Sequence, residues 1–470
     1  MRLVAIGGSD AGISAALRAR ELDSGADVSV IVADEYPNFS ICGIPYHVSG
    51  EVPDWRNLAH RTAADLEATG MRLVLGTTAE RIDVDAHEVH VREACGAHSI
   101  VPYDALVIGT GACPVRPPIE GLDRLTARDR VHVVHSMGDT FEVMDSVTAA
   151  NTRRAVIIGA GYLGLEMAEA LIVRGLEVTQ VEQLPEVLPT VDPELGAKVA
   201  AELRAHGVDV VTDTAVRRIT RDEHAGTQPL RVEGASIDGA PFRRDADMVL
   251  IFAGVRPDVA LAESAGAKLG VRGAIDVDRG MRTNLPDVFA AGDCVVTHHR
   301  LLGTTYIPLG TTAHKQGRIA GENAVGGRRE FAGSLGTQVV KVFDMAAART
   351  GLRDHEAVNA GFSPVTVAAE ADDHKAYYPG SHRIAMRWTG DRDTGRLLGV
   401  QLFGHRHAEV AKRVDIAAAA IFNGMTVDAF SELDLSYTPP LGSPWDAMQI
   451  GAQAWVRAVV SVRRSGEAGG

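Results

Sequence analysis

Aromatic residues, cysteines and positive charge are all scarce in this sequence. Aromatic side chains make up 5% of the 470 residues, and the formal net charge is −14 at pH 7. A broad nucleic-acid or anionic-membrane surface requires positive charge, so we expect neither kind of partner. No apolar run reaches the ~18 residues that a membrane span requires, and no signal peptide precedes the first predicted strand. The sequence therefore predicts a cytoplasmic protein without membrane association.

The four cysteines lie far apart in the sequence. They are Cys42, Cys95, Cys113 and Cys294. There is no CxxC pair and no histidine–cysteine spacing typical of zinc sites, so we expect neither a disulfide framework nor a metal site. Cys42 raises a functional question because it lies in NFSICGIPYH, between a hydroxyl-bearing turn and a glycine and a proline. The residues alone leave three interpretations: a core side chain, half of a disulfide, or a nucleophile.

The chain is long enough for two to four domains at ~150 residues each. An apolar strand, a glycine-rich turn, an amphipathic helix and a second strand follow one another over residues 2–34, and the same order returns over residues 153–183. Each βαβ unit is typical of a Rossmann-like nucleotide-binding domain. From about residue 330 the pattern changes to alternating strand-like runs and a long helix. The expected fold class is therefore α/β, with two Rossmann-like domains followed by an α+β domain.

The second glycine-rich turn is a full GxGxxG, formed by Gly159, Gly161 and Gly164. The first glycine permits the tight bend, the second lets a pyrophosphate approach the backbone, and the third lets helix and strand pack closely. The amides at the start of the next helix then face the phosphates. Glu182 ends the following strand, 18 residues after Gly164, where a carboxylate would bind ribose hydroxyls. Because Glu182 would repel a 2′-phosphate, the pattern favours NADH over NADPH.

The first turn, GGSDAG, is a weaker match because Ser9 replaces the middle glycine between Gly7 and Gly12. Taken alone, it is equally compatible with an ordinary turn. Its position after a strand, with Asp34 lying 22 residues beyond Gly12, favours a second dinucleotide site. We prefer Asp34 to the adjacent glutamate as the ribose ligand. Later, VFAAGDC presents Asp293 at the end of a strand, where its carboxylate suits a ribityl hydroxyl or, alternatively, caps a helix.

Together these motifs resemble those of the FAD-dependent pyridine nucleotide–disulfide oxidoreductases, and in particular the branch with a single redox cysteine. That branch contains coenzyme A-disulfide reductases, NADH oxidases, NADH peroxidases and persulfide reductases. The resemblance covers nearly the whole chain. The motifs that carry it are GGSDAG, SICGIPY, TGACPVRPPIEG, GAGYLGLE, TNLPDVFAAGDC, IPLGTTAHKQGRIAGEN, LGTQVVKVFD, YYPG and YTPPLGSPWD.

The resemblance implies a homodimer in which each chain has three domains. The FAD-binding domain would consist of residues 1–118 and 248–328, the NAD(P)H-binding domain of residues 119–247, and the C-terminal dimerisation domain of residues 329–470. The residues implied to bind FAD are Gly7, Ser9, Gly12, Asp34, the backbone of Ala79, Gly111 and Asp293. The residues implied to bind NADH, or NADPH in its place, are Gly159, Gly161, Gly164 and Glu182, with Glu166 near the nicotinamide.

The resemblance also implies that Cys42 is the redox nucleophile. Classical members of the family have two cysteines separated by four residues, but here the corresponding positions hold Pro37 and His47. Without a neighbouring thiol, Cys42 must cycle through a mixed disulfide, a persulfide or a sulfenic acid. Electrons would pass from NADH through the flavin to the sulfur bound at Cys42. The other three cysteines are expected to be structural.

Further active-site residues are implied by the same resemblance. Tyr437 would reach the active site of the partner subunit and stabilise or protonate a leaving thiolate, and Tyr378 is a second candidate for that role. Filling of the dimer interface is the alternative role for both tyrosines. The residues expected to contact substrate are Arg18, Arg20 and Ser40. Ile41 and Glu21 stand where coenzyme A-specific relatives commonly have asparagine and a basic residue, and the carboxylate of Glu21 would repel the 3′-phosphate of coenzyme A.

We therefore predict an FAD-dependent enzyme that transfers electrons from NADH through Cys42 to a low-molecular-weight disulfide or persulfide, such as coenzyme A disulfide. The first alternative is an NADH oxidase or peroxidase, in which oxygen or peroxide is the acceptor and Cys42 forms a sulfenic acid. The second is a flavin-dependent reductase of a ferredoxin-type partner, which does not need Cys42. The third is a redox-sensing scaffold without enzymatic activity.

Overall fold

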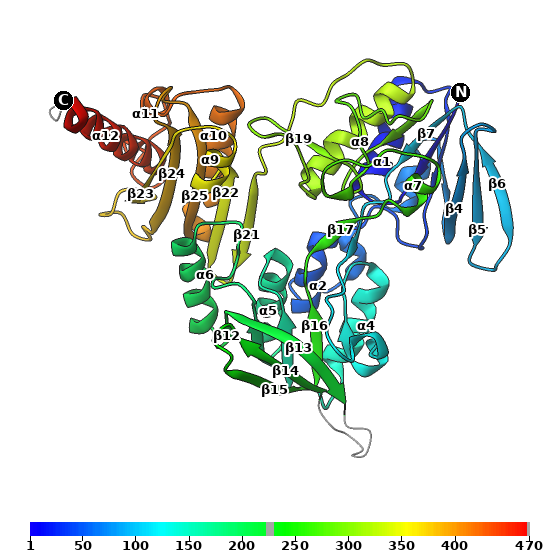
Figure 1. The fold of residues 1–470 in the computed structure, drawn as a ribbon, viewed down its shortest axis with the longest axis horizontal. Helices are drawn as coiled ribbons and strands as arrows, with labels where there is room; N and C mark the ends of the chain where they lie inside the picture. Colours follow the sequence, from blue (N-terminus) through cyan, green and yellow to red (C-terminus); the bar gives the residue numbers. More distant parts are fainter. Residues whose placement is uncertain (222–229, 468–470) are drawn as a thin grey trace. The chain divides into compact units, whose positions relative to one another are not determined.

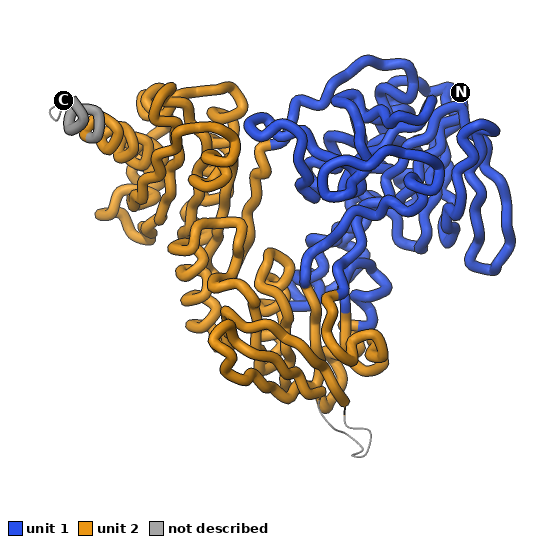
Figure 2. Tube along the Cα trace, in the orientation of Figure 1, with its two compact units in different colours: residues 1–116, 133–142, 253–334 blue, residues 117–132, 143–252, 335–470 orange. Residues whose placement is uncertain are grey.

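The computed structural model of the chain describes residues 1–221 and 230–467 (Figure 1). Its contacts divide the chain into two compact units (Figure 2). Unit 1 consists of residues 1–116, 133–142 and 253–334, and unit 2 of residues 117–132, 143–252 and 335–470. Each unit is therefore assembled from segments that are distant in the sequence.

Unit 1 is built on a parallel sheet of five strands in the order β18-β7-β1-β2-β3. The strands are short apolar runs, as expected for a sheet that is covered on both faces. All residues of β7 are buried, and the register places Leu3 of β1 opposite Val28 of β2 and Ala105 of β7. The strand bounds are β1 Arg2–Ile6, β2 Asp27–Ile31, β3 Met71–Val74, β7 Ala105–Ile108 and β18 Val288–Ala290.

Helices α1 (Asp10–Leu22) and α8 (Gly310–Ala324) pack closely against each other in unit 1. The contact depends on small residues, because a side chain at Gly317 of α8 would overlap the carbonyl oxygen of Ala11 on α1. The buried face of α1 is likewise mostly alanine. This close approach brings the first turns of the two helices together.

Smaller elements surround the parallel sheet of unit 1. They include an antiparallel sheet, β4-β5-β6, and the two-stranded pairs β8-β17 and β19-β20. The bounds of the strands are β4 Thr77–Asp83, β5 Glu88–Glu93, β6 His98–Pro102, β8 Ala112–Pro114, β17 Val255–Pro257, β19 Thr297–His299 and β20 Gly303–Thr305. The bounds of the short helices are η1 Ile41–Gly43, α2 Ile44–Ser49, η2 Trp55–Leu58, α3 Ala63–Glu67, α7 Ala260–Ser264 and η5 Val271–Gly273.

Unit 2 contains a second parallel sheet, in the order β12-β11-β10-β16-β9, and an antiparallel sheet, β13-β14-β15. β10 (Arg154–Ile158), α5 (Tyr162–Val173) and β11 (Glu177–Val181) form the second predicted βαβ unit, which is thereby confirmed. β16 (Met248–Ile251) pairs with β10, although the boundaries implied above place residue 248 in the FAD-binding domain. A buried apolar strand carries no local sign of which of two similar sheets it joins.

The remaining elements of this part of unit 2 connect and cover the two sheets. Their bounds are β9 Val131–His132, α6 Pro193–Ala205, β12 Asp209–Val211, β13 Thr214–Arg221, β14 Leu230–Ser236 and β15 Pro241–Ala246. Three further elements are η3 Leu122–Arg124, η4 Ala127–Asp129 and α4 Met137–Thr148. The boundary between the two units falls within α4, after residue 142.

The C-terminal part of unit 2 is an antiparallel sheet in the order β21-β22-β25-β24-β23, accompanied by four helices. Trp388 of β24 is completely buried, and a side chain at Gly451 of α12 would overlap its indole ring. The predicted α+β character of this segment is confirmed. The bounds are β21 Gln338–Val342, β22 Met345–Gly351, α9 Asp354–Asn359, β23 Pro364–Asp372, β24 Arg383–Asp391, β25 Leu397–His405, η6 Arg406–Ala408, α10 Val410–Phe422, α11 Val427–Ser431 and α12 Ala447–Glu467.

Within residues 1–221 and 230–467, none of the helices combines the length and the apolar character needed to cross a bilayer.

Candidate active site

Cys42 lies in the one-turn helix η1, which leads directly into helix α2. Its side chain is exposed, whereas Ile44 and Val48 of α2 are completely buried and anchor the segment in unit 1. Gly43 lies so close to Leu58 that a side chain at this position would overlap that leucine. The exposure of Cys42 excludes a core role, and no disulfide links the cysteines of the described residues. Of the three interpretations, the nucleophile is the one that remains, and it stays a prediction.

Three backbone hydrogen bonds fasten the cysteine segment to the rest of unit 1. The amide of Asn38 donates to the carbonyl of Gly8 at 2.6 Å, and the amide of His60 donates to the carbonyl of Asn38 at 2.9 Å. The amide of Ser40 donates to the carbonyl of Leu58 at 2.8 Å. Because Gly8 belongs to the first glycine-rich turn, the candidate nucleophile is tied directly to the predicted FAD site.

The first glycine-rich turn has the shape of a phosphate-binding loop. Gly7 has a φ of 114°, and a side chain there would overlap the carbonyl oxygen of Gly109. A side chain at Gly12 would overlap the carbonyl oxygen of Gly7, so helix and strand meet as closely as the motif requires. Helix α1 begins after Ser9, and no described side chain caps its first amides. Those amides and the positive end of the helix dipole are available to a pyrophosphate.

The other predicted FAD residues also lie in unit 1. Asp34 follows β2, and its Oδ1 accepts a hydrogen bond from the amide of Tyr36 at 2.9 Å while the side chain stays exposed. Ala79 is paired with Val91 in the antiparallel sheet β4-β5-β6. Gly111 has a φ of 73° and open space around its α-carbon. The fold thus gathers these residues in one unit, and their individual roles remain predictions.

Asp293 lies in the turn after β18, close to the start of α8. The preceding Gly292 donates its amide hydrogen to Oε1 of buried Gln316 at 3.0 Å, which fixes the turn against α8. Burial, and to a smaller extent the neighbouring carboxylate of Asp10, raises the pKa of Asp293 to about 6. A backbone hydrogen bond from Leu309 opposes this shift. A carboxyl in such a place prefers a neutral hydroxyl partner to a second anion.

The second glycine-rich turn of the chain lies in unit 2, and each of its three glycines has the surroundings that the GxGxxG spacing predicts. Gly159 has a φ of 103°, and a side chain there would overlap the carbonyl oxygen of Phe252. A side chain at Gly164 would overlap the carbonyl oxygen of Gly159, whereas a Cβ added at Gly161 would have no described atom within 4 Å. Gly161 also precedes helix α5 as its N-cap. The middle glycine is therefore the one around which a pyrophosphate has room.

Glu182 joins the end of β11 to this turn. Its Oε2 accepts a hydrogen bond from the amide of Ala160 at 2.8 Å, and its Oε1 accepts one from the amide of Leu184 at 3.0 Å. The side chain is 7% exposed. The carboxylate is therefore held at the turn where the sequence places it, and its ribose-binding role stays a prediction. Glu166 lies half-buried on α5, one turn beyond the glycines.

Tyr378 and Tyr437 lie on two segments of unit 2 that are joined by a backbone hydrogen bond. The amide of Lys375 donates to the carbonyl of Pro439 at 3.4 Å. The two tyrosines are 42% and 45% exposed, respectively. Other large apolar side chains exposed on these segments are Tyr377, Leu441 and Trp445. The predicted tyrosines thus belong to an exposed aromatic surface.

Arg413 stabilises both tyrosine-bearing segments. It is buried in α10, and its Nη2 donates to the carbonyl of Asp373 at 2.7 Å and to Oδ2 of Asp446 at 3.0 Å. Asp373 precedes the Tyr378 segment, and Asp446 follows the Tyr437 segment. The guanidinium of Arg413 therefore links the segment that carries Tyr378 to the segment that carries Tyr437.

The predicted substrate-contacting arginines are already engaged by other groups. The guanidinium of Arg18 lies 2.6 Å from Oε2 of Glu322 and 2.9 Å from Oε1 of Glu21. Arg20 donates to the carbonyl oxygens of Ser24 and Ala26 at 2.7 and 2.6 Å, and to that of Thr69 at 3.0 Å. Arg20 therefore organises the backbone around β2 and β3. Of the three residues, Ser40 is the one that lies in the cysteine segment.

Comparison with known proteins gives the family. A model described as "Pyridine nucleotide-disulphide oxidoreductase" matches residues 1–317, and a model described as its "dimerisation domain" matches residues 337–448. The chain belongs to the pyridine nucleotide-disulphide oxidoreductases. The predicted family, fold class and oxidoreductase activity are confirmed, as is the use of FAD and NAD(P)H by proteins of this kind. The dimerisation domain supports a homodimer.

Several members of the family are similar over nearly the whole chain. An NAD(P)H sulfur oxidoreductase (CoA-dependent) of Pyrococcus furiosus is 36% identical over 95% of this chain and 97% of its own. An NADH oxidase of Methanocaldococcus jannaschii is 31% identical over 96% of this chain and 98% of its own. The structure of an NAD-dependent persulfide reductase from A. fulgidus is 36% identical, with a TM-score of 0.90 over 97% of this chain and 83% of its own.

The residues of this oxidoreductase fit an FAD molecule. The glycine-rich turn leaves no room for side chains at its close contacts, and the amides that begin α1 have no described side-chain cap. Asn38 is 1% exposed, yet its Oδ1 has no hydrogen-bond partner among the described residues. A buried orphan acceptor beside the glycine turn is the kind of group that a ligand satisfies. Gly7, Ser9, Gly12 and Asp34 would therefore hold the nucleotide, as the sequence predicts.

Two features of the site were missed by sequence reasoning. Asn38 supports the cysteine segment at a φ of 60°, and the sign available in the sequence was the asparagine itself, since asparagine tolerates this conformation. Asp10, His60 and His314 come together although they are distant in sequence, and no local spacing indicates such a cluster.

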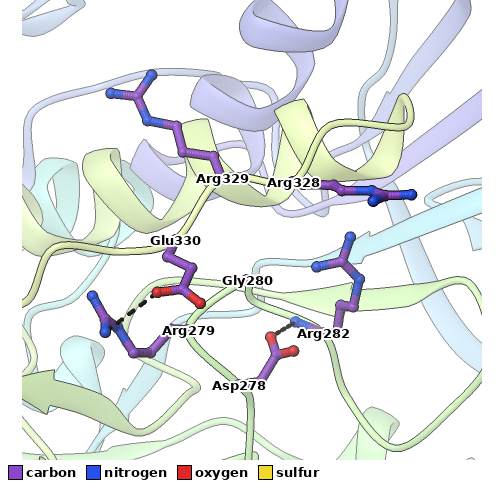
Figure 3. Close-up of a pocket in the computed structure, with 7 residues that line it drawn as sticks. All are labelled: Asp278, Arg279, Gly280, Arg282, Arg328, Arg329 and Glu330. Atoms are coloured by element: carbon purple, nitrogen blue, oxygen red, sulfur yellow. Dashed lines mark hydrogen bonds and ion pairs between the residues drawn. The ribbon is translucent and has the colours of Figure 1, made fainter.

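A hollow of about 550 Å³ in unit 1 lies among arginines rather than among the predicted site residues (Figure 3). Arg279 reaches Glu330 at 3.3 Å (Figure 3). Arg329 lies 3.6 Å from Glu322. Nη2 of Arg282 donates to the carbonyl of Gly327 at 3.4 Å. Carboxylates and a carbonyl thus already meet three of the four arginines that line the hollow.

Proposed function

We propose that this protein oxidises NADH and reduces a small disulfide or persulfide through the sulfur of Cys42. The observation that carries the proposal is an exposed Cys42 on a segment hydrogen-bonded to Gly8 of the first glycine-rich turn. Relatives named as a sulfur oxidoreductase and a persulfide reductase support the same chemistry.

The other cysteines are less suited to nucleophilic attack. Cys294 is completely buried, and burial raises the pKa of its thiol to about 11. Burial also raises the pKa of Cys113. Cys95 is exposed, but its Sγ donates to Oε2 of Glu93 at 3.5 Å, and it lies between β5 and β6 rather than at a glycine-rich turn. Because the thiolate is the attacking form, Cys42 is the best candidate of the four.

The proposed cycle conserves atoms and electrons. The Cys42 thiolate attacks one sulfur of R–S–S–R, one thiolate leaves and takes up a proton, and the other half remains as Cys42–S–S–R. FAD, when bound, supplies the two electrons that NADH provides. Cleavage of the mixed disulfide releases the second thiol and returns Cys42 to the thiolate. The sum converts NADH, a proton and a disulfide into NAD⁺ and two thiols.

We assign proton donation to Tyr437, reaching the partner subunit's site in the homodimer. Its exposure, and the attachment of its segment to that of Tyr378, support a surface role that a second subunit completes. A phenol is able to protonate or stabilise a leaving thiolate. Tyr378 is the second candidate.

The carboxylate of Glu21 on α1 favours an acceptor without phosphate groups. Arg18 pairs with Glu21 and Glu322, and Glu21 also lies 3.0 Å from Arg318. Arg329 lies 3.6 Å from Glu322, so three arginines face these two glutamates, and the carboxylate of Glu21 would still repel the 3′-phosphate of coenzyme A. A small uncharged disulfide or a persulfide makes no such demand.

NADH is the proposed electron donor in preference to NADPH. The carboxylate of Glu182 is fixed at the second glycine-rich turn by the amides of Ala160 and Leu184. A 2′-phosphate beside this carboxylate would be repelled, whereas a ribose diol would donate hydrogen bonds to it. Comparison of kcat/KM for NADH and NADPH, with Glu182→Ala as the variant, tests this preference.

The acceptor is tested by anaerobic oxidation of NADH with one acceptor at a time. The panel is glutathione disulfide, cystine, coenzyme A disulfide, polysulfide and hydrogen peroxide, with an aerobic run for oxygen. We expect the largest kcat/KM with a small disulfide or polysulfide. Faster turnover with oxygen or peroxide would instead support the oxidase alternative, which the named NADH oxidase of Methanocaldococcus jannaschii favours.

A further inference from the structure

Three metal-ligating side chains of unit 1 converge near the cysteine segment. Asp10 comes from the first turn of α1, His314 from the first turns of α8, and His60 from the segment after η2. Nε2 of His314 lies 3.3 Å from Oδ1 of Asp10. One ligand atom from each side chain lies within 4.8 Å of the other two. None of the three is itself assigned to FAD, NADH or substrate, although Asp10 lies between Ser9 and Gly12 of the first glycine-rich turn and neighbours Asp293.

The imidazole of His314 is oriented by a second polar contact. Its Nδ1 lies 2.9 Å from Oγ of Ser14, which is one helical turn beyond Asp10 on α1. When Nδ1 carries the proton and donates it to Ser14, Nε2 keeps a free lone pair on the side of Asp10. Such a hydrogen bond to the remote nitrogen fixes the tautomer and ring orientation that a metal-binding histidine requires.

Asp10 is placed where a cation would stabilise it. A carboxylate oxygen of Asp10 lies within 4.8 Å of a ring nitrogen of His314 and of one of His60. The ring centroids of His60 and His314 lie 6.0 Å apart with an interplanar angle of 73°. Two imidazoles and one carboxylate therefore lie close enough together to share one cation.

The separations fit a tetrahedral zinc ion. With bonds of ~2.0–2.1 Å, ligand atoms of such an ion lie about 3.4 Å apart. Asp10 and His314 already have this separation. His60 is exposed, so rotation of its side chain is able to close the remaining distance. We propose that Asp10, His60 and His314 bind a zinc-type divalent cation and leave a fourth position open.

Occupation of this site would act on the cysteine segment. The amide of His60 donates to the carbonyl of Asn38, four residues before Cys42. A cation held by Asp10, His60 and His314 would therefore join the segment after η2 to α1 and α8 and stiffen the support of Cys42. It follows that zinc binding should raise the melting temperature.

The test is equilibrium binding of Zn²⁺ to the FAD-loaded dimer after removal of metals with EDTA. All proteins carry Cys42→Ser, because a thiolate binds zinc by itself. The decisive variant is His60→Ala, since an exposed side chain is expected to be removable without unfolding the protein. His405→Ala is the matched control, because it removes a histidine of unit 2 that stacks on another histidine, His382, at 3.9 Å.

We expect His60→Ala to remove one bound zinc per chain, or to weaken its binding at least tenfold, and to abolish the rise in melting temperature. Asp10→Asn should do the same, and His405→Ala should do neither. Flavin content and the metal-free melting temperature show whether each variant is folded. Equal zinc binding by the parent and by the double variant Asp10→Asn/His60→Ala would overturn the proposal.

Discussion

The amide of Asn38 donates a 2.6 Å hydrogen bond to the carbonyl of Gly8, and this contact joins the cysteine segment to the first glycine-rich turn. Asn38 makes the bond with a φ of 60°, a conformation that asparagine and glycine adopt but β-branched residues resist. The position of Cys42 therefore depends on a backbone conformation at a residue four places earlier.

The first prediction concerns this conformation. Asn38→Val should lower the free energy of unfolding by about 1–2 kcal/mol, because a β-branched residue is strained at positive φ. Asn38→Gly is the matched control, since glycine accepts this φ without strain. Chemical denaturation of both variants measures the difference. Equal stability of the two would show that the φ of residue 38 does not support the segment.

The second prediction separates two glycines of the same turn. Gly161→Ala should leave the protein folded but raise the KM for NADH roughly tenfold, because the added methyl occupies space that the pyrophosphate needs. Gly159→Ala should instead lower the free energy of unfolding by about 2 kcal/mol or more, because φ is 103° and the methyl would overlap the carbonyl of Phe252. Steady-state kinetics and thermal melts of both variants distinguish the effects. The same KM for Gly161→Ala and the parent would contradict the site.

The third prediction concerns coenzyme A. Glu21→Gln should raise kcat/KM for coenzyme A disulfide severalfold, because it releases Arg18 and Arg318 from one of their carboxylates. The value for cystine should not change. Glu67→Gln, at an exposed position of α3, is the control. If Glu21→Gln altered both acceptors equally, the ion pairs would have no part in selecting the acceptor.

The fourth prediction concerns pH. The pKa of Asp293 is about 6 in the folded protein against 3.8 for an ordinary aspartate. Between these values the folded state holds more protons than the unfolded state, so stability falls as the pH rises from about 4 to 6. Asp293→Asn cannot ionise, so between pH 4 and 7 the parent should lose about 2 kcal/mol more stability than the variant. Denaturation of FAD-depleted protein at both pH values measures this loss. Parallel curves for parent and variant would show that Asp293 is ionised normally.

Much of the fold follows from local sequence patterns. Short apolar strands ending in glycines, such as residues 2–8 and 154–161, predict parallel strands and phosphate-binding turns, and both turns have the geometry that their glycine spacing requires. Cys42 is exposed, and its role as the nucleophile stays a prediction. These features depend on neighbours in sequence, which is why the pattern reveals them.

The features that the sequence did not reveal depend on long-range packing. The ion pair between Arg18 and Glu322 joins α1 to α8 across about 300 positions of the sequence. The sheet to which β16 belongs is likewise determined by its pairing with β10. The same close packing of α1 and α8 brings Asp10 to His314. No spacing rule connects such residues, because the tertiary contacts alone bring them together.

The measurement that most directly tests the proposed function is anaerobic NADH oxidation by Cys42→Ser with the best small disulfide as acceptor. The variant should retain FAD and its reduction by NADH but lose at least about 100-fold in turnover, because the nucleophile that forms the mixed disulfide is gone. Cys95→Ser, which removes the other exposed thiol, should keep the parent activity. Full disulfide reductase activity in Cys42→Ser would contradict the proposal and favour a reductase that passes electrons directly from flavin to its acceptor.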